Sequence, residues 1–360
     1  MGNFAAKLCL VCLFVLCASQ AQDSFASGPM QQAIPRIPDQ ITAQEAVALE
    51  AGLITNPDNL TARERLITYY FYQLIASRSS VLEEKREKHV FWLIEHHPES
   101  ELAGSPEAEI MPMGFSGSIE GYGRGKQLWL LQVETYPDNQ QILRNAARFL
   151  SLSDGKLAKD LLEKASALDP SDAETTSSLA QSYDHERMES TSPENKAALA
   201  KKSLSLRERA LEKTPGEQRF YELGPAAKSA LEAGEPEKAK QYASELLESA
   251  PKFKNGWNYG NALHEGNIVL GRIALQRGDI ARAKEHLLAA GQTPGSPQLD
   301  SFGPNMTLAK ELLEKGERDT VLNYLQSCAK FWKMSGDKLQ TWSATIKGGG
   351  TPDFGANLYY

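Results

Sequence analysis

One spacing of small and apolar residues occurs four times in this 360-residue chain and constrains its fold more than any other feature. Each occurrence starts from a small or β-branched residue, and small or apolar residues follow four and seven positions later. The four starting residues are Ala158, Ala239, Ala283 and Val321. Because an α-helix has about 3.6 residues per turn, positions with these offsets share one face of a helix. The pattern therefore predicts four helices that each bury one stripe.

A second helix is predicted just before each of these four. A small residue stands twelve positions ahead of each start, at Ala146, Ala227, Gly271 and Ala309. Small side chains there let two helix backbones approach closely. In three cases a glycine followed by an acidic residue separates the two helices: Gly234-Glu235, Gly278-Asp279 and Gly316-Glu317. Glycine takes the left-handed conformation that ends a helix, and an acidic residue suits the positive start of the next one. Each unit is therefore predicted to be a helical hairpin.

These hairpins resemble the tetratricopeptide repeat (TPR), a degenerate motif of about 34 residues. The segment around Leu270-Gly271, Ala274, Ala283, Leu287 and Ala290 matches it best. The resemblance implies an all-α, TPR-like helical-hairpin solenoid wound as a right-handed superhelix. Its clearest repeats are expected at residues 140–170, 173–215, 220–251, 264–295 and 302–334. The turn glycines 234, 278 and 316 lie 44 and 38 residues apart, so the spacing leaves the shape of the groove open.

The N-terminal segment has the pattern of a cleavable signal peptide. Lys7 precedes the apolar run Leu8–Leu16, and the small residues Ser19 and Ala21 suit a cleavage site after Ala21. An uncleaved anchor is the competing interpretation, but the run is about half of the ~20 residues that span a bilayer. The pattern favours a periplasmic or secreted protein.

The remaining chain is predicted to have three parts. Residues 22–40 contain three prolines and no helical period, which is typical of a linker. The solenoid is expected over residues 41–346, and a capping box of Thr42 and Glu45 begins its first helix. Residues 347–360 form a Gly-rich C-terminal tail that either packs as a cap or stays loose.

Charge and cysteine content narrow the possible functions. The net charge of -7 argues against nucleic-acid binding, which relies on attraction to phosphate. Signal removal would leave Cys328 as the one remaining cysteine, so no internal disulfide or thiol metal cluster is expected, and Cys328 is interpreted as a buried small hydrophobe. No second segment is apolar enough to be expected to span a membrane.

No catalytic or metal motif is evident, so no catalytic residue, metal or cofactor is predicted. His96-His97 point about 100° apart on a helix and cannot easily share a metal. The glycine-rich residues 114–125 lack the strand and GK[ST] of a phosphate loop and are interpreted as an inter-helix loop. One group of aromatic residues is interpreted as core, with a stacking surface as the alternative: Trp257, Tyr259, Phe331, Trp332 and Trp342.

The function favoured by this pattern is an exported scaffold that binds a protein or peptide and catalyses nothing itself. The alternatives are a helical-toroid enzyme acting on cell-wall glycan through a pair of acids, and a carrier of carbohydrate or another small ligand. The sequence leaves the oligomeric state open.

Three basic residues are the candidate partner-binding site. Lys228, Arg272 and Lys310 each stand eleven positions before the start of their hairpin's second helix. In TPR proteins this position tends to point into the groove, which implies a basic ladder able to capture an acidic peptide. The competing explanation is ordinary helix-surface ion pairing, with Glu232 and Glu314 four residues after the two lysines.

Overall fold

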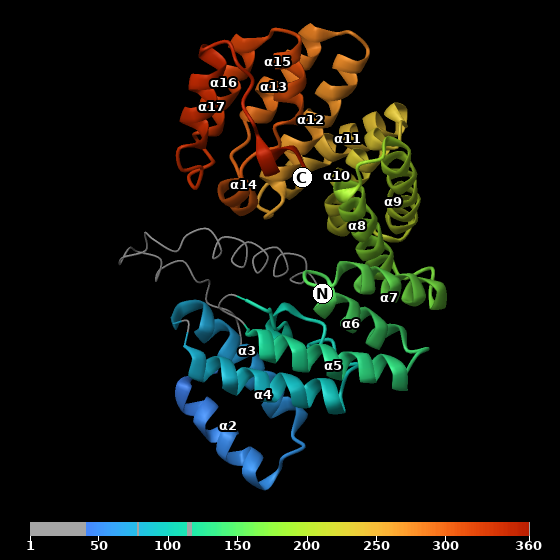
Figure 1. The fold of residues 1–360 in the computed structure, drawn as a ribbon, viewed down its shortest axis with the longest axis vertical. Coiled ribbons are helices and arrows are strands. Elements are labelled where there is room, and N and C mark those ends of the chain that lie inside the picture. The colour runs from blue at the N-terminus through green and yellow to red at the C-terminus, as the bar shows by residue number, and fades with distance from the viewer. Residues whose placement is uncertain (1–40, 78, 114–116, 360) are drawn as a thin grey trace. The chain divides into compact units, whose positions relative to one another are not determined.

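The computed structural model describes residues 41–77, 79–113 and 117–359 (Figure 1). The predicted signal peptide, the predicted linker and residues 114–116 of the predicted loop lie outside this part of the chain. The described residues contain helices and no strand, and the helices pack in consecutive pairs. The predicted all-α, helical-hairpin fold class is confirmed. The chain forms two compact units that divide after Pro170.

The first unit contains six α-helices and one 3-10 turn in its described part. They are α2 (Ala43–Thr55), α3 (Leu60–Ser77), α4 (Ser80–His96), η2 (Pro106–Ala108), α5 (Ile119–Thr135), α6 (Gln140–Leu150) and α7 (Gly155–Leu168). α3 pairs with α4, α6 pairs with α7, and α5 packs against both α4 and α6. Thr42 and Glu45 form the predicted capping box at the start of α2: Glu45 N donates to Thr42 Oγ1 (3.2 Å), and Thr42 N donates to Glu45 Oε2 (2.7 Å).

The second unit is a row of four hairpins followed by a C-terminal helix. The hairpins are α8 (Ala173–Glu189) with α9 (Pro193–Lys213), α10 (Gly216–Glu232) with α11 (Pro236–Ser249), α12 (Tyr259–Gln276) with α13 (Ile280–Gly291), and α15 (Thr307–Glu314) with α16 (Arg318–Cys328). Shorter elements complete the unit: η3 (Ala250–Phe253), α14 (Pro297–Phe302), α17 (Lys338–Lys347) and η4 (Gly355–Leu358). Figure 1 shows the succession of helices from α8 to α17.

The small residues of the repeated pattern lie at the contacts between helices. The starting residues Ala158, Ala239, Ala283 and Val321 are at most 2% exposed. The turn glycines 234, 278 and 316 have φ of 78°, 79° and 84°, in the left-handed region that glycine adopts without strain. At the first of these turns, Glu235 N donates to Ala230 O (2.9 Å), which ends α10.

Enlarging a small residue at these contacts is expected to destabilise the second unit. A Cβ at Gly271 would lie 2.3 Å from Leu308 Cδ2 and 3.1 Å from His286 Cβ, and Ala227 is fully buried. We expect Gly271→Leu or Ala227→Leu to lower the free energy of unfolding by about 1–3 kcal/mol through overpacking. Urea denaturation measures the loss, and Ala281→Leu, at an exposed position of α13, is the control that should stay within about 0.5 kcal/mol of wild type.

The interpretation of residues 114–125 as a loop is wrong for its second half, because helix α5 has begun before Gly121. The glycines there are needed for close packing rather than for a flexible chain. A Cβ at Gly121 would lie 2.2 Å from Glu87 Oε1, and one at Gly125 would lie 2.6 Å from Phe149 Cζ. Glycine lowers helix propensity, but here it lets α5 contact its neighbours directly.

The C-terminal tail packs on the second unit in its described part. The side-chain amide of Asn357 donates to Phe302 O (3.0 Å) and Pro304 O (3.1 Å), and Asn357 O accepts from Met306 N (2.7 Å). Phe354 is 2% exposed and contacts the ring of Trp342 edge-on. Residues 350–359 therefore cap the end of the hairpin row.

Three of the five C-terminal aromatic residues are core residues, as the first interpretation held. Phe331, Trp332 and Trp342 are between 2% and 6% exposed and belong to the largest apolar cluster of the second unit. Their faces are not available for stacking a ligand. Trp257 and Tyr259 are half-buried. Among the described residues, we find no helix that combines the length and the apolar character required to cross a bilayer.

Candidate functional site

Charged side chains on the first helix of each hairpin form a continuous row in the second unit. Arg187 on α8 pairs with Glu232 on α10 (Nη1 to Oε2, 3.3 Å), and Glu232 pairs with Arg272 on α12 (Oε1 to Nη1, 2.8 Å). Arg272 Nε donates in turn to Glu311 Oε1 on α15 (2.9 Å). We call these four residues the charge row. It links four successive hairpins with alternating sign.

The three basic residues predicted from the sequence lie in or beside this row. Arg272 is its central cation. Lys228 is on α10, one turn before Glu232, and its Nζ lies 3.0 Å from Glu265 Oε1 on α12. Lys310 on α15 is half-buried and forms no ion pair with any residue that the structure describes. The structure therefore places the three cations on consecutive first helices, with acidic residues between them.

Ion pairing in this region differs from the expected pairs within one helix. In the described part of the second unit, Lys228 does not pair with Glu232, and Lys310 does not pair with Glu314. Lys228 and Arg272 instead pair with carboxylates on neighbouring helices, 37 to 40 residues away in the sequence. Such pairs connect the hairpins, whereas a pair within one helix would stabilise that helix alone.

The carboxylates of the charge row favour the charged form of Arg272. Burial lowers the pKa of Arg272, but the carboxylates of Glu311 and Glu232 outweigh it, so that the net shift of the pKa is upward. Its guanidinium group donates to one oxygen of each carboxylate. A delocalised planar cation that bridges two acids can hold three helices in register.

A small polar hollow lies at the start of α12, beside the ion pair of Lys228 and Glu265. Its lining residues are Asn261, His264, Glu265, Gln298, Leu299, Gly303 and Asn305. Its volume of about 10 Å³ gives room for roughly one water molecule. Helix α14 supplies one wall through Gln298 and Leu299. Asn261 is held there by two hydrogen bonds: Ser296 Oγ donates to Asn261 Oδ1 (2.6 Å), and Asn261 Nδ2 donates to Gln298 Oε1 (2.9 Å).

A neutral histidine is buried in this hollow. His264 is 1% exposed, and its Nε2 lies 3.0 Å from the hydroxyl of Tyr324. Since that hydroxyl donates its hydrogen to Asn305 O (3.2 Å), Nε2 of His264 is the donor of the pair. Burial, with a smaller contribution from the nearby Lys228 cation, lowers the pKa of His264 to about 3.

This histidine predicts a loss of stability in mild acid. Between about pH 6.5 and 3 the unfolded chain binds a proton at His264 and the folded chain does not, so stability falls as the pH falls. From pH 7 to pH 5 we expect wild type to lose about 2 kcal/mol of unfolding free energy that His264→Gln does not lose. Urea denaturation at both pH values measures this difference. His185→Gln, at an exposed histidine, is the control and should keep the wild-type loss.

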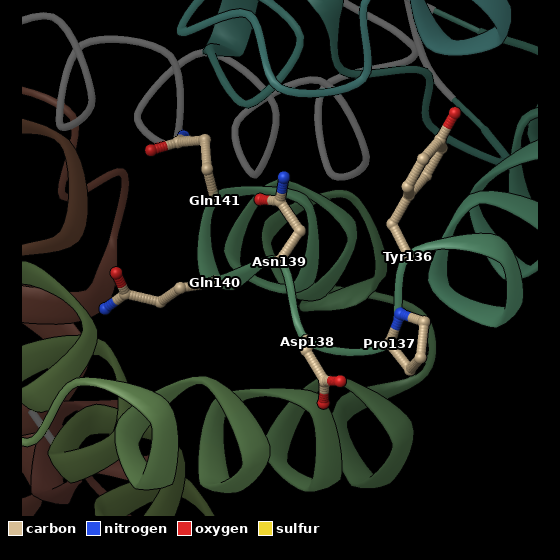
Figure 2. Close-up of a pocket in the computed structure, with 6 residues that line it drawn as sticks. All are labelled: Tyr136, Pro137, Asp138, Asn139, Gln140 and Gln141. Atoms are coloured by element: carbon tan, nitrogen blue, oxygen red, sulfur yellow. The ribbon is translucent and has the colours of Figure 1, made fainter.

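A larger and open hollow lies at the turn between α5 and α6 in the first unit. Figure 2 shows its lining residues: Tyr136, Pro137, Asp138, Asn139, Gln140 and Gln141. Its volume is about 550 Å³, and its walls come from this one segment. Asn139 Oδ1 accepts from Ile142 N (3.1 Å) and so caps α6. The remaining groups are amides, one phenol and one carboxylate.

Neither of the two hollows brings two carboxylates together. Each has a single carboxylate, Asp138 or Glu265, and the second is paired with Lys228. An acid pair of the kind that cleaves glycosides is therefore absent from both. Within the described residues, no group of three or more metal-binding side chains lies close enough to hold an ion. His96 stacks on Trp92, with ring centroids 4.6 Å apart.

Sequence patterns pointed to Lys228, Arg272 and Lys310 and named Glu232 only as a partner within its own helix, and they missed Arg187, Glu265 and Glu311. Glu265 and Glu311 have no feature in the sequence that marks them as partners of residues 37 to 39 positions away, and His264 stands alone. Only the stacking of the hairpins brings them together. A scan against models of protein families finds no match, and a search of curated proteins finds no relative.

Proposed function

We propose that this protein is an exported scaffold of TPR-like hairpins that binds an extended segment of another protein and catalyses nothing itself. The observation that carries the proposal is the charge row across α8, α10, α12 and α15. A row of groups on successive helices suits a ligand that also runs across those helices. An extended polypeptide has this form, and hairpin arrays offer long surfaces of this kind.

The lysines Lys228 and Lys310, which lie beside the charge row, favour a partner segment with carboxylates. Lys310 has no ion pair within the described chain, and Lys228 is held by one carboxylate only. A partner carboxylate could bind Lys310 directly and compete with Glu265 for Lys228. Arg272 is a poor contact for a partner, because two glutamates already occupy its guanidinium group. Charge-assisted hydrogen bonds of this kind are about twice as strong as neutral ones.

The first experiment identifies the partner. The tagged protein is expressed in its own host, crosslinked in place and purified, and the proteins recovered with it are identified by mass spectrometry. The affinity of each purified candidate is then measured over a series of salt concentrations. Binding that weakens with salt supports the proposal, since ion pairs are screened. If no recovered protein binds the purified scaffold at any salt concentration, the proposal is wrong.

Two variants then locate the binding surface. Lys310→Glu and Lys228→Glu should each weaken partner binding and reduce its salt dependence, whereas Lys240→Glu, at an exposed position of α11, should leave both unchanged. Circular dichroism checks that the fold is retained. Unchanged affinity in both variants would place the partner elsewhere on the protein.

Export is the second part of the proposal and is tested separately. The apolar run and small residues before Gln22 motivate it. Intact-mass analysis of protein recovered from the host should give a chain that starts at Gln22 and lies outside the cytoplasm. A full-length mass in the membrane fraction would refute the cleavage.

A further inference from the structure

The polar hollow at the start of α12 is lined by three side chains that each keep one hydrogen-bonding atom unused within the described chain. They are His264, Glu265 and Gln298. His264 is 1% exposed, and its Nε2 donates to the hydroxyl of Tyr324 (3.0 Å). Its Nδ1 is therefore an acceptor, and no described residue donates to it. Since an unpaired buried acceptor is costly, a ligand that donates to Nδ1 is favoured.

Glu265 and Gln298 supply the other two unused atoms. Glu265 Oε1 pairs with Lys228 Nζ (3.0 Å), whereas Glu265 Oε2 accepts from no described group. Gln298 Oε1 accepts from Asn261 Nδ2 (2.9 Å), which identifies the other end of the Gln298 amide as its Nε2 donor. That donor is also unused within the described chain. The hollow thus presents two acceptors, His264 Nδ1 and Glu265 Oε2, and one donor, Gln298 Nε2.

These three groups together select a ligand that both donates and accepts hydrogen bonds. An ammonium ion or a metal cation has no lone pair with which to accept from Gln298 Nε2, and the Lys228 cation is close by. An anion would meet the Glu265 carboxylate. A water molecule has two hydrogens for the two acceptors and an oxygen that accepts from the amide, and three hydrogen bonds are typical of a buried water. The volume of about 10 Å³ suits one water oxygen and excludes a larger organic group.

We propose that this hollow is a binding site for one internal water molecule. The water donates to His264 Nδ1 and Glu265 Oε2 and accepts from Gln298 Nε2. It joins α12 to α14 and holds the Glu265 carboxylate in position for its ion pair with Lys228. A buried water with three hydrogen bonds is costly to remove, so it resides in the protein far longer than a surface water does. This inference does not rest on the proposed partner binding.

A crystal structure of the protein, at a resolution that shows ordered water, tests the site directly. One density peak of the size of an oxygen atom should lie about 2.7–3.2 Å from His264 Nδ1, Glu265 Oε2 and Gln298 Nε2. A hollow without density would overturn the proposal. Density at about 2.0–2.6 Å from the lining atoms would overturn it as well, because a metal ion binds at those distances.

Nuclear magnetic resonance of protein with labelled histidines tests how long the water stays in solution. A resident water should give NOE and ROE cross-peaks of opposite sign with Hε1 of His264, the ring proton next to Nδ1, because it tumbles with the protein. His264→Gln assigns the signal, since the cross-peaks are lost with the ring.

The control for this measurement is Tyr324→Phe. It removes the nearby hydroxyl, whose hydrogen exchange with solvent can imitate a bound water, and it leaves the three proposed water contacts in place. The cross-peaks should therefore persist in this variant, and circular dichroism confirms that it is folded. Their absence from wild type, or their loss in folded Tyr324→Phe, would show that no water resides in the hollow.

Discussion

Replacing Gly260 by alanine is expected to lower the free energy of unfolding by about 3 kcal/mol or more, because its new methyl group would meet backbone. A Cβ at Gly260 would lie 1.8 Å from Gly295 O, and Gly295 has no room to retreat, since its own Cα faces the Phe331 side chain. A hydrogen bond also joins the two segments, because Thr293 Oγ1 donates to Gly260 O (2.8 Å). The start of α12 would have to move away from the loop that contains Thr293 and Gly295.

Urea denaturation of the whole protein measures this effect. The matched control is Gly123→Ala in α5, where a Cβ would meet nothing within 4 Å. That change should stabilise the protein by about 0.5–1 kcal/mol, because alanine has the higher helix propensity. A Gly260→Ala variant as stable as wild type would mean that the two backbones are not in contact.

Removing the central cation of the charge row is expected to cost about 2–4 kcal/mol of unfolding free energy. Arg272→Met keeps much of the side-chain volume but removes the cation between Glu232 and Glu311 and leaves Glu232 with Arg187 alone, and stranded partly buried charge is strongly destabilising. The loss should shrink in acid, where the carboxylate of Glu311, whose pKa burial raises, takes up a proton. The double variant Arg272→Met/Glu311→Gln should lose less than Arg272→Met alone.

An exposed arginine provides the control for this prediction. Arg277 pairs with Glu237, and both side chains are largely exposed to solvent. Arg277→Met should stay within about 0.5 kcal/mol of wild type, since surface ion pairs contribute little. Equal losses in the two variants would mean that the charge row does not connect the hairpins. The measurement for both is urea denaturation at pH 7, repeated at pH 4.5 for the acid dependence.

The all-α fold class and the pairing of consecutive helices into hairpins could be predicted, because the sequence patterns that indicate them are local. A helical face repeats every three to four residues, so Ala239, Ala243 and Leu246 identify one buried stripe without knowledge of the rest of the chain, and all three are fully buried. The turn at Gly278-Asp279 depends likewise on two adjacent residues: Gly278 has a φ of 79°, and Asp279 Oδ1 accepts from Arg282 N (3.0 Å) at the start of α13.

The partners of the charged residues were decided by the tertiary structure alone. Lys228 has Glu232 four residues away, but it pairs with Glu265, because the packing of α10 against α12 brings that carboxylate to 3.0 Å. The same holds for the glycines of α5, since only the approach of Glu87 explains why Gly121 lies in a helix. Local spacing determines which face of a helix is apolar, whereas the relative placement of helices distant in sequence determines what each face contacts.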